Sequence, residues 1–292
     1  MQGAGCPRCS HHISNGEKEI IDFIDTLGLE YIISDRNILK GKEIDIYIPS
    51  KKIAIEYDGL LWHSEKFGKD KNYHLNKTIE CEKQGIRLIH IFEDEWTFKK
   101  EITKSMLLEI LGLLEEKIIL EKCSCKRISS NEATKFINEN YIFEKNRATY
   151  HYGLYYKNEL VSIMSFKEDK RNKGTYRLLN FCKKLYIDIG NGVLKLLNCF
   201  VEDLKPKQIM ANADLRWTIG DEYKKIGFNY KHNISPNYTY VIGQKREKRS
   251  KIKEKFPFIR DFTKTDLLKE NGIYRIYDCG VKVFFKDIYI KK

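Results

Sequence analysis

The chain has 292 residues, which is enough for about two domains of ordinary size. Hydrophobic residues make up 42% of it, a content that excludes a disordered tail protein. No apolar run approaches the ~18 residues of a membrane span, and the start MQGAGCPRCS lacks the apolar stretch of a signal peptide. We therefore expect a soluble, cytoplasmic protein that does not bind membranes.

The charge is divided unevenly along the chain. Over the whole sequence, 53 Lys and Arg stand against 41 Asp and Glu, a net charge of +12. Residues 1–122 hold 18 basic and 22 acidic residues, or −4, whereas residues 123–292 hold 35 and 19, or +16. A half with this surplus of positive charge is suited to binding phosphates. The alternative is that the lysines serve only solubility.

The first half alternates helices and strands. After an arm over residues 1–14 that carries cysteines, apolar residues at helical spacing predict a helix over residues 15–27, which Ser14 and Glu17 begin with a capping box. Strands are predicted over residues 30–34, 43–48, 52–57 and 87–92, and helices over residues 73–84 and 97–114. The composition changes between residues 114 and 126, so we expect one domain over residues 15–118 and another over residues 119–292.

The second half predicts a further domain of helices and strands. One helix is expected to end near residue 140, and two more are expected over residues 192–204 and 220–226. Strands are expected over residues 149–156, 160–166, 176–184, 208–211 and 238–242. The last two strands, 273–277 and 282–285, are expected to form a hairpin around Cys279-Gly280. The predicted fold class is therefore α/β in the mixed, α+β sense, with a mixed sheet and flanking helices in the first domain.

Acidic residues gather on one face of two neighbouring predicted strands. Side chains of a strand alternate between its faces, so Asp45 in EIDIYIP can lie opposite Glu56 or Asp58 in KIAIEYD if the strands pair. Carboxylates that are brought together repel each other unless a cation or a proton lies between them. Mg²⁺, a hard cation with oxygen ligands, is the expected cofactor, held by Asp45, Asp58 and Glu56. The alternative is a polar sheet face in contact with water.

Three further side chains are candidates to act with this cluster. His63 could activate water or protonate a leaving oxygen, or it could be structural. Glu17 leans toward the buried stripe of its helix, which could aim it at the cluster, although the capping box explains it equally well. Lys77 shares a helix face with His74 and Cys81. It could supply a cation near a phosphate, or it could be a solvated helix lysine.

Two stretches resemble a known family. The runs IDIYIPSKKIAIEYDGLLWHSE and YHLNKTIECEKQGIRLIHIFEDEW resemble the very-short-patch-repair (Vsr-like) endonucleases, a branch of the PD-(D/E)xK nucleases. They resemble more closely the related phage-encoded homing endonucleases with a Glu/Asp/His/Asp signature. The resemblance covers residues 15–96 and implies an enzyme, a hydrolase that cuts phosphodiester bonds of double-stranded DNA with Mg²⁺. Asp45 matches the metal-binding aspartate, His63 the histidine after the tryptophan, and Glu17 the first-helix glutamate.

The resemblance is incomplete around the end of the third predicted strand. The acid-x-Lys motif of the superfamily reads Glu-Tyr-Asp at residues 56–58, so the role of the lysine passes to His63, Lys77 or His74, or is unnecessary. The aspartate of this triplet stands where the repair enzymes have a histidine. The zinc that those enzymes hold near this histidine is not expected here, because Leu60 and Ser64 are not cysteines.

The cysteines suggest a structural zinc ion elsewhere. Cys6 and Cys9 form the C-x₂-C half of a tetrahedral site, and Cys123 and Cys125 offer a second pair near the expected domain boundary. Eight cysteines in a chain without a secretory start are expected to be reduced thiols or metal ligands rather than disulfides. The alternative is a flexible arm with inert thiols.

The basic half is predicted to contact double-stranded DNA. Aromatic and cationic residues alternate after residue 230, and the expected phosphate contacts come from Lys245, Arg246, Lys248, Arg249 and Lys251. These cations could instead lie on a solvated helix. A single active site in each chain would favour a nick in one strand, or a homodimer for a double-strand break.

A rival interpretation comes from two other stretches of the basic half. YIDIGNGVLKLL and ADLRWTIGDEYKKIGF weakly resemble the acetyl-coenzyme-A loop and a later segment of GNAT acetyltransferases, and a Gly-x-Gly before a helix can bind a pyrophosphate. We interpret this domain as a GNAT-like scaffold that positions DNA. The alternatives are an acetyltransferase with a degenerate nuclease module, and a non-catalytic DNA-binding protein whose carboxylates are structural.

Overall fold

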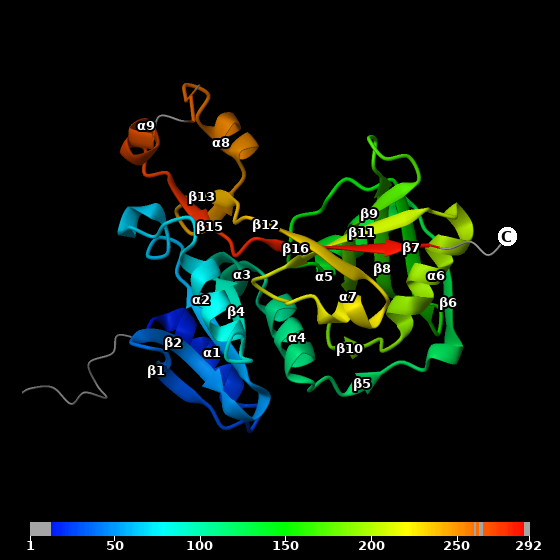
Figure 1. Cartoon of the computed structure of the whole chain (residues 1–292), viewed down its shortest axis with the longest axis horizontal. Coiled ribbons are helices and arrows are strands. Elements are labelled where there is room, and N and C mark those ends of the chain that lie inside the picture. Colours follow the sequence, from blue (N-terminus) through cyan, green and yellow to red (C-terminus); the bar gives the residue numbers. More distant parts are fainter. Residues whose placement is uncertain (1–12, 260, 263–264, 289–292) are drawn as a thin grey trace, which may run out of the picture. The chain divides into compact units, whose positions relative to one another are not determined.

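The computed structural model describes residues 13–259, 261–262 and 265–288, and the chain divides into two compact units. Unit 1 comprises residues 1–98 and 238–277, and unit 2 comprises residues 99–237 and 278–292. Each unit combines helices with sheets (Figure 1), which confirms the predicted α/β class. Within the described ranges, none of the helices has the length and apolar character that a membrane crossing requires.

Unit 1 is built on a four-stranded sheet in the order β1-β2-β3-β4, antiparallel except for the parallel pair of β3 and β4. Its strands are β1 (Ile32–Leu39), β2 (Lys42–Ile48), β3 (Ile53–Asp58) and β4 (Arg87–Phe92). Its helices are α1 (Asn15–Asp25), α2 (Tyr73–Glu82) and α3 (Glu93–Phe98), with short 3-10 turns η1 (Pro49–Lys51) and η2 (Glu65–Phe67). The capping box of Ser14 and Glu17 begins α1 as predicted.

Helix α2 covers one face of this sheet. Parallel neighbours need a crossover connection, and α2 lies in the connection from β3 to β4. Cys81 of α2 is fully buried and packs in one hydrophobic cluster with Ala54 of β3 and Leu88 of β4. His74 and Lys77 lie on the same face of the helix and are also buried. The crossover therefore brings polar side chains of the helix against the sheet.

A second, three-stranded sheet completes unit 1 in the antiparallel order β14-β13-β15. Its elements are β13 (Tyr238–Ile242), β14 (Lys245–Glu247), α8 (Arg249–Lys255), α9 (Thr265–Glu270) and β15 (Tyr274–Tyr277). Val241 and Ile276 of this sheet pack with Leu60 and Phe92 of the first segment in a buried apolar cluster. This contact explains why residues 238–277 belong to unit 1.

Unit 2 contains a seven-stranded sheet in the order β12-β16-β11-β9-β8-β7-β6, in which only β9 and β11 pair in parallel. Its strands are β6 (Cys123–Arg127), β7 (Tyr150–Tyr156), β8 (Glu159–Glu168), β9 (Thr175–Lys183), β11 (Gln208–Asp214), β12 (Asn229–Ile234) and β16 (Val281–Asp287). The other elements are α4 (Lys100–Leu111), β5 (Glu116–Lys117), η3 (Leu120–Lys122), α5 (Ser130–Asn140), β10 (Ile187–Asp188), α6 (Gly192–Leu204) and α7 (Asp221–Lys225).

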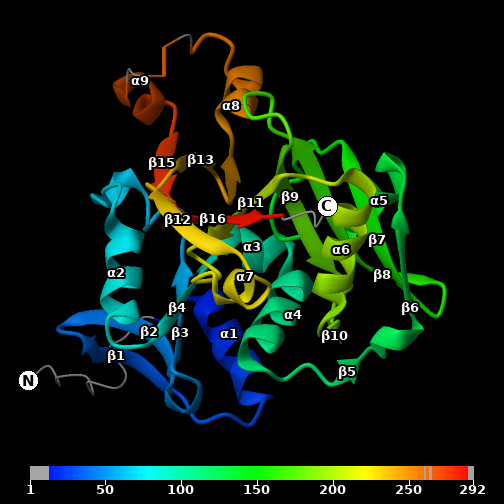
Figure 2. The ribbon, with the colours of Figure 1, turned by 45° about the vertical axis from the view of Figure 1, so that its right-hand side comes forward.

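Helices α5 and α6 cover opposite faces of the seven-stranded sheet (Figure 2). Phe200 of α6 stacks on Phe166 of β8, with ring centroids 3.7 Å apart, in the main core of unit 2. Phe136 of α5 packs instead with Ile163 and Cys182 in a separate cluster. Because successive residues of a strand point to opposite faces of the sheet, β8 contributes side chains to both hydrophobic clusters.

The structure corrects two sequence predictions. The expected hairpin of residues 273–277 and 282–285 does not form, because β15 pairs with β13 in unit 1 whereas β16 pairs with β11 and β12 in unit 2. The expected helix over residues 97–114 is divided into α3 and α4, since Lys99 leaves the helical region with φ −134° and ψ 35°. The compact units have other bounds than the expected domains 15–118 and 119–292, since unit 1 comprises residues 1–98 and 238–277; the expected domains stay a prediction.

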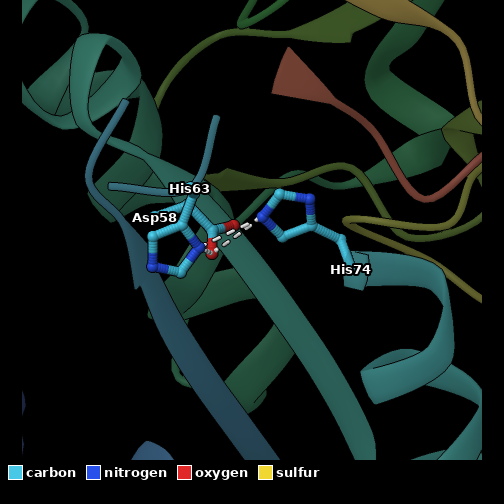
Figure 3. A group of neighbouring side chains, drawn as sticks. All are labelled: Asp58, His63 and His74. Carbon is cyan, nitrogen blue, oxygen red and sulfur yellow. Dashed lines mark hydrogen bonds and ion pairs between the residues drawn. The ribbon is translucent and has the colours of Figure 1, made fainter. Parts of the chain in front are cut away.

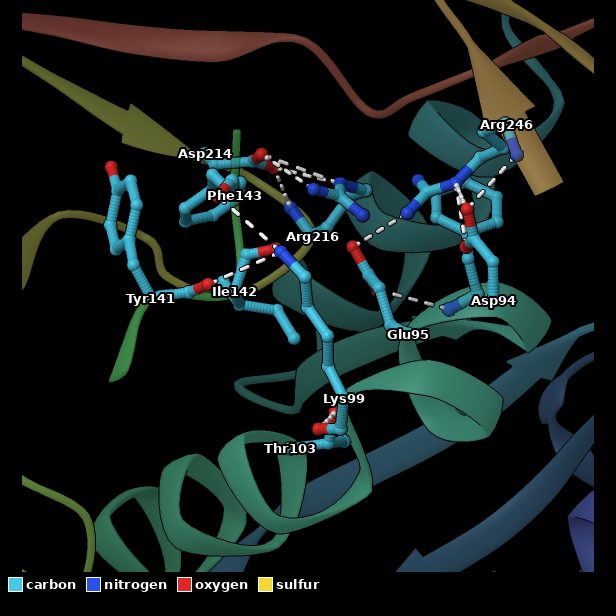
Figure 4. Close-up of polar contacts among 11 residues, drawn as sticks. Asp94, Glu95, Lys99, Thr103, Tyr141, Ile142, Phe143, Asp214, Arg216 and Arg246 are labelled. Atoms are coloured by element: carbon cyan, nitrogen blue, oxygen red, sulfur yellow. Dashed lines mark hydrogen bonds and ion pairs between the residues drawn. The ribbon is translucent and has the colours of Figure 1, made fainter. Parts of the chain in front are cut away.

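Arg246 of β14 forms ion pairs with two carboxylates of α3. Its Nε donates to Oδ1 of Asp94 at 2.8 Å and its Nη2 donates to Oε1 of Glu95 at 2.8 Å (Figure 4). The guanidinium also lies 4.1 Å from the ring centroid of Phe92. With a side chain that is only 16% exposed, Arg246 holds the two segments of unit 1 together.

We predict that Arg246→Ala lowers the free energy of unfolding by about 3 kcal/mol, because it removes one partner of a largely buried ion pair. Chemical denaturation measures this change. Lys251→Ala is the matched control, since Lys251 is exposed and its ion pair with Glu254 is exposed too; it should change stability by less than about 0.5 kcal/mol. Equal stability of the two variants would contradict the structural role of Arg246.

Candidate active site

Three neighbouring strands of unit 1 carry polar side chains on the face that α2 covers. The register of β2 and β3 places Asp45 beside Glu56, and Oδ2 of Asp45 accepts a hydrogen bond from the backbone N–H of Tyr57 at 2.7 Å. On β4, His90 lies opposite Glu56. Asp58 follows Glu56 by two residues and so shares its face. The predicted meeting of acidic groups from adjacent strands is therefore observed.

Two further segments add imidazoles and an amine. His74, Lys77 and Thr78 lie on the buried face of α2, at the spacing of three and four residues that lines up helix side chains. His63 follows β3 in a turn closed by its own backbone N–H, which donates to the carbonyl of Gly59 at 2.9 Å. Its side chain is 17% exposed, so His63 is one of the members of the cluster that reach solvent.

Asp58 lies at the centre of the imidazoles and is fully buried. Its Oδ1 is 2.8 Å from Nδ1 of His63 and 3.4 Å from Nε2 of His74, and these two nitrogens are 3.1 Å apart. Figure 3 shows both rings directed at the carboxylate from opposite sides. Neither contact gives Oδ1 hydrogen-bond geometry, so within the described residues this oxygen has no hydrogen-bond partner.

The other oxygen of Asp58 is held by His90. Nδ1 of His90 lies 2.9 Å from Oδ2 of Asp58, and Nε2 of His90 lies 3.0 Å from the hydroxyl of Thr78. Burial lowers the pKa of His90 to about 4, against the opposing effect of Asp58. Burial opposes the ionisation of Asp58, but the imidazoles of His74, His90 and His63 together hold its pKa well below the usual value. Asp58 is therefore an anion that His90 holds at Oδ2 and that His63 and His74 approach at Oδ1.

Lys77 and Glu56 form a buried ion pair beside this carboxylate. Nζ of Lys77 donates to Oε2 of Glu56 at 2.5 Å. Burial disfavours the charged amine, but Glu56 outweighs it and keeps the pKa of Lys77 above its usual value. Oε1 of Glu56 is buried and, in the part of the chain that the structure describes, has no hydrogen-bond partner.

Asp45 and Glu17 form the more protonated side of the cluster. Burial raises the pKa of Asp45 to about 6, although the hydrogen bond from Tyr57 acts in the other direction. Burial and the nearby charge of Asp45 raise the pKa of Glu17 to about 7. Glu17 also closes the capping box with Ser14, so the two roles considered for it occur together.

The structure thus brings together the predicted residues Glu17, Asp45, Glu56, Asp58, His63 and Lys77. Two further members were underestimated from the sequence. The sequence indicates for His74 a helix face shared with Lys77 and an alternative for the role of the missing lysine, and it places His90 within a buried strand. The signal for His90 was present, since a histidine in the apolar run RLIHIF needs a polar partner when it is buried.

The other predicted sites are placed differently. Cys6 and Cys9 lie outside the described residues, and Cys123 and Cys125 lie on one face of β6 as free thiols. Burial raises the pKa of both of these thiols. The zinc site stays a prediction.

The cations predicted to contact DNA all lie in unit 1, on β14 and on or beside α8, rather than in a separate basic domain. Lys245 lies 4.5 Å from the ring centroid of Phe98, and Arg249 lies 4.8 Å from that of Phe262. Counted by unit, 24 basic and 22 acidic residues give +2 in unit 1, and 29 and 19 give +10 in unit 2. The positive surplus therefore remains largest in unit 2.

No protein-family model matches the chain, and no curated protein matches it. Among solved structures, a GNAT family acetyltransferase from Elizabethkingia anophelis is 10% identical, with a TM-score of 0.32 over 57% of this chain and 99% of that one. A streptothricin acetyltransferase candidate from Bacillus anthracis is 9% identical, with a TM-score of 0.29; the match spans 50% of this chain and only 65% of the length of that one. The catalytic domain of the homing endonuclease I-Bth0305I is 22% identical, with a TM-score of 0.29 over 35% of this chain and 99% of that one.

These structural neighbours are mostly acetyltransferases, with an endonuclease domain among them. Both parts of the predicted resemblance, the GNAT-like one and the Vsr-like one, stay predictions. Since each of these TM-scores is below 0.5, the functional argument rests on the chain's own residues.

We predict that Asp45→Asn stabilises unit 1 at alkaline pH when a chelator is present. A raised pKa means that the folded chain holds the proton of Asp45 more tightly than the unfolded chain does. Its contribution to stability is therefore complete below about pH 4 and is lost as the pH rises through about 6. The free energy of unfolding of the variant should exceed that of the wild type by about 2 kcal/mol at pH 8 and match it at pH 4. Equal curves at both pH values would contradict this.

Proposed function

We propose that the cluster in unit 1 hydrolyses phosphodiester bonds of double-stranded DNA with the help of a divalent cation, so that the chain acts as a DNA endonuclease. The observation that carries this proposal is the gathering of Asp45, Glu56 and Asp58 with Lys77 and His63 on one buried sheet face. Carboxylates this close favour a cation between them. Oε1 of Glu56, which has no hydrogen-bond partner in the described residues, and the carboxylate of Asp45 offer oxygen donors that fit a hard cation such as Mg²⁺.

The chain's own residues divide the remaining tasks. Asp45 and Glu56 would hold the cation, which when bound supplies a Lewis acid for a non-bridging phosphate oxygen. Lys77 adds positive charge beside Glu56 and thereby replaces the lysine that the acid-x-Lys motif lacks. His63 has Nδ1 on Asp58, which leaves Nε2 on the far side of the ring (Figure 3) to donate a proton to the leaving 3′ oxygen. Asp58 fixes the orientation of that ring.

The cations outside the cluster support DNA as the substrate. Lys245, Lys248, Arg249 and Lys251 are exposed and lie in the same unit as the cluster, and unit 2 adds a charge of +10. Phosphate contacts by several Lys and Arg residues would release counterions from DNA. One such cluster among the described residues of each chain favours a nick, with a homodimer required for a double-strand break.

We predict that Asp45→Ala and His63→Ala each lower the rate of Mg²⁺-dependent plasmid cleavage at least about 100-fold and leave DNA affinity nearly unchanged. Conversion of supercoiled to nicked or linear plasmid measures the rate, and a gel-shift titration measures the affinity. The matched controls are Asp22→Ala, an exposed carboxylate of α1, and His232→Ala, an exposed histidine of β12. Undiminished cutting by Asp45→Ala would refute the proposed site.

We also predict that DNA affinity falls about tenfold or more between 50 and 200 mM salt, because several phosphate contacts are expected. Fluorescence anisotropy with a labelled duplex measures it. An affinity that does not depend on salt would speak against phosphate contacts.

Acyl transfer in unit 2 is the second candidate function. The observation that favours it is a helix, α6, that begins after the Gly190–Gly192 turn and crosses from β9 to its parallel neighbour β11, an arrangement that can bind a pyrophosphate. Packing also explains Gly192, since a Cβ there would lie 2.7 Å from Cδ2 of Leu154. Calorimetry with acetyl-coenzyme A tests acyl transfer. Saturable binding would support this second candidate, and the absence of binding would remove it.

A further inference from the structure

We propose that Asp58, His63 and His74 form a binding site for a first-row transition-metal ion, distinct from the Mg²⁺ expected at the oxygen donors of Asp45 and Glu56. Each of the three side chains offers one donor atom, and these atoms lie within 4.8 Å of one another. They come from the end of β3, from the turn that follows it and from α2. The inference concerns metal binding and stands whether or not the cluster cuts DNA.

The distances between the donors match a shared metal ion. Oδ1 of Asp58 is 2.8 Å from Nδ1 of His63 and 3.4 Å from Nε2 of His74, and the two nitrogens are 3.1 Å apart. Ligands about 2.1 Å from an ion lie about 3.0 Å apart at right angles and about 3.4 Å apart in a tetrahedron. The observed triangle spans this range, so one ion can contact all three atoms with small adjustments.

The chemistry of the donors selects the class of ion. Two imidazoles and one carboxylate are the ligand set of non-haem iron sites, and imidazole suits zinc, copper, iron and nickel. Mg²⁺ prefers oxygen ligands, which the neighbouring carboxylates provide. The cluster therefore offers two unlike sites, one made of oxygen atoms and one that includes nitrogen.

The contacts around Asp58 hold its carboxylate in a position suited to binding a metal ion. Its Oδ2 is fixed by His90, which Thr78 holds in turn, and such outer contacts orient the ligands of metal sites. Its Oδ1 is the oxygen that His63 and His74 approach, is fully buried, and has no hydrogen-bond partner within the described residues. His63, which is 17% exposed, leaves a route for the ion from solvent.

The test uses the full chain with Cys6→Ser and Cys9→Ser, so that those thiolates do not compete for the metal. Co²⁺ is titrated into chelator-treated protein and followed by its visible absorption and by calorimetry, in the presence of excess Mg²⁺. We expect one Co²⁺ to bind per chain despite the Mg²⁺. We expect His63→Ala and His74→Ala each to weaken binding at least about 10-fold, with a loss of the visible absorption.

The controls separate this inference from the proposed function. His232→Ala should bind Co²⁺ as the parent does, and circular dichroism checks that each variant folds. His63→Ala tests the site even if His74→Ala does not fold, because His63 lies at the surface end of the cluster. Full displacement of Co²⁺ by Mg²⁺, or unchanged binding by a folded His63→Ala, would overturn the inference. Plasmid cleavage with Mg²⁺ alone is measured separately, so a failure of the metal site and a failure of the nuclease are distinguishable.

Discussion

The burial of the Asp58 carboxylate is the constraint on which the site depends. An ionised carboxylate removed from water costs several kcal/mol unless other groups compensate for the lost hydration. Here His90 holds one oxygen, and His63 and His74 approach the other. These partners come from β4, from the turn after β3 and from α2, so the charge is compensated only when all three segments are in place. The geometry of the site is therefore a consequence of the fold rather than of one local motif.

The parallel pairing of β3 and β4 explains how the helix enters the site. A parallel pair requires a crossover, and the buried face of the crossover helix carries an apolar residue, Cys81, next to the polar pair of His74 and Lys77. Cys81 anchors the helix against the sheet, while Lys77 reaches Glu56. A lysine two residues after the acid on the same strand is unnecessary, because the crossover helix places Lys77 next to Glu56.

Much of this cluster could be predicted from local periodicity. Alternation along two short strands places Asp45, Glu56 and Asp58 on one face, and the helical spacing places His74 beside Lys77. The register between non-adjacent segments could not be read in this way. His90 meets Asp58 only because β4 pairs in parallel with β3, and hydrophobic runs do not specify their partner strand.

The bounds of the compact units and the pairing of the last two strands both depend on contacts between residues that are distant in the sequence. Arg246 contacts Asp94 across 152 residues, and a contact of that separation leaves no local pattern in the sequence. Likewise, β15 and β16 are neighbours along the chain, yet each completes a different sheet. The run of cations after residue 244 does not by itself predict which residues contact DNA. It includes both Arg246, which forms ion pairs with carboxylates of α3, and Lys251, which is exposed.

The carboxyl groups of the cluster differ in how tightly they hold a proton. The fold raises the pKa of Asp45 to about 6 and of Glu17 to about 7, so these groups give up protons when a cation binds beside them near neutral pH. Asp58 keeps its charge, since its imidazole partners hold its pKa low. A cation at the oxygen side must therefore displace protons, and its affinity rises with pH. An ion at Asp58 meets a carboxylate that is already ionised. Asp45 and Asp58, on the neighbouring strands β2 and β3, thus carry conditional and permanent negative charge, a difference that would separate the two proposed ions.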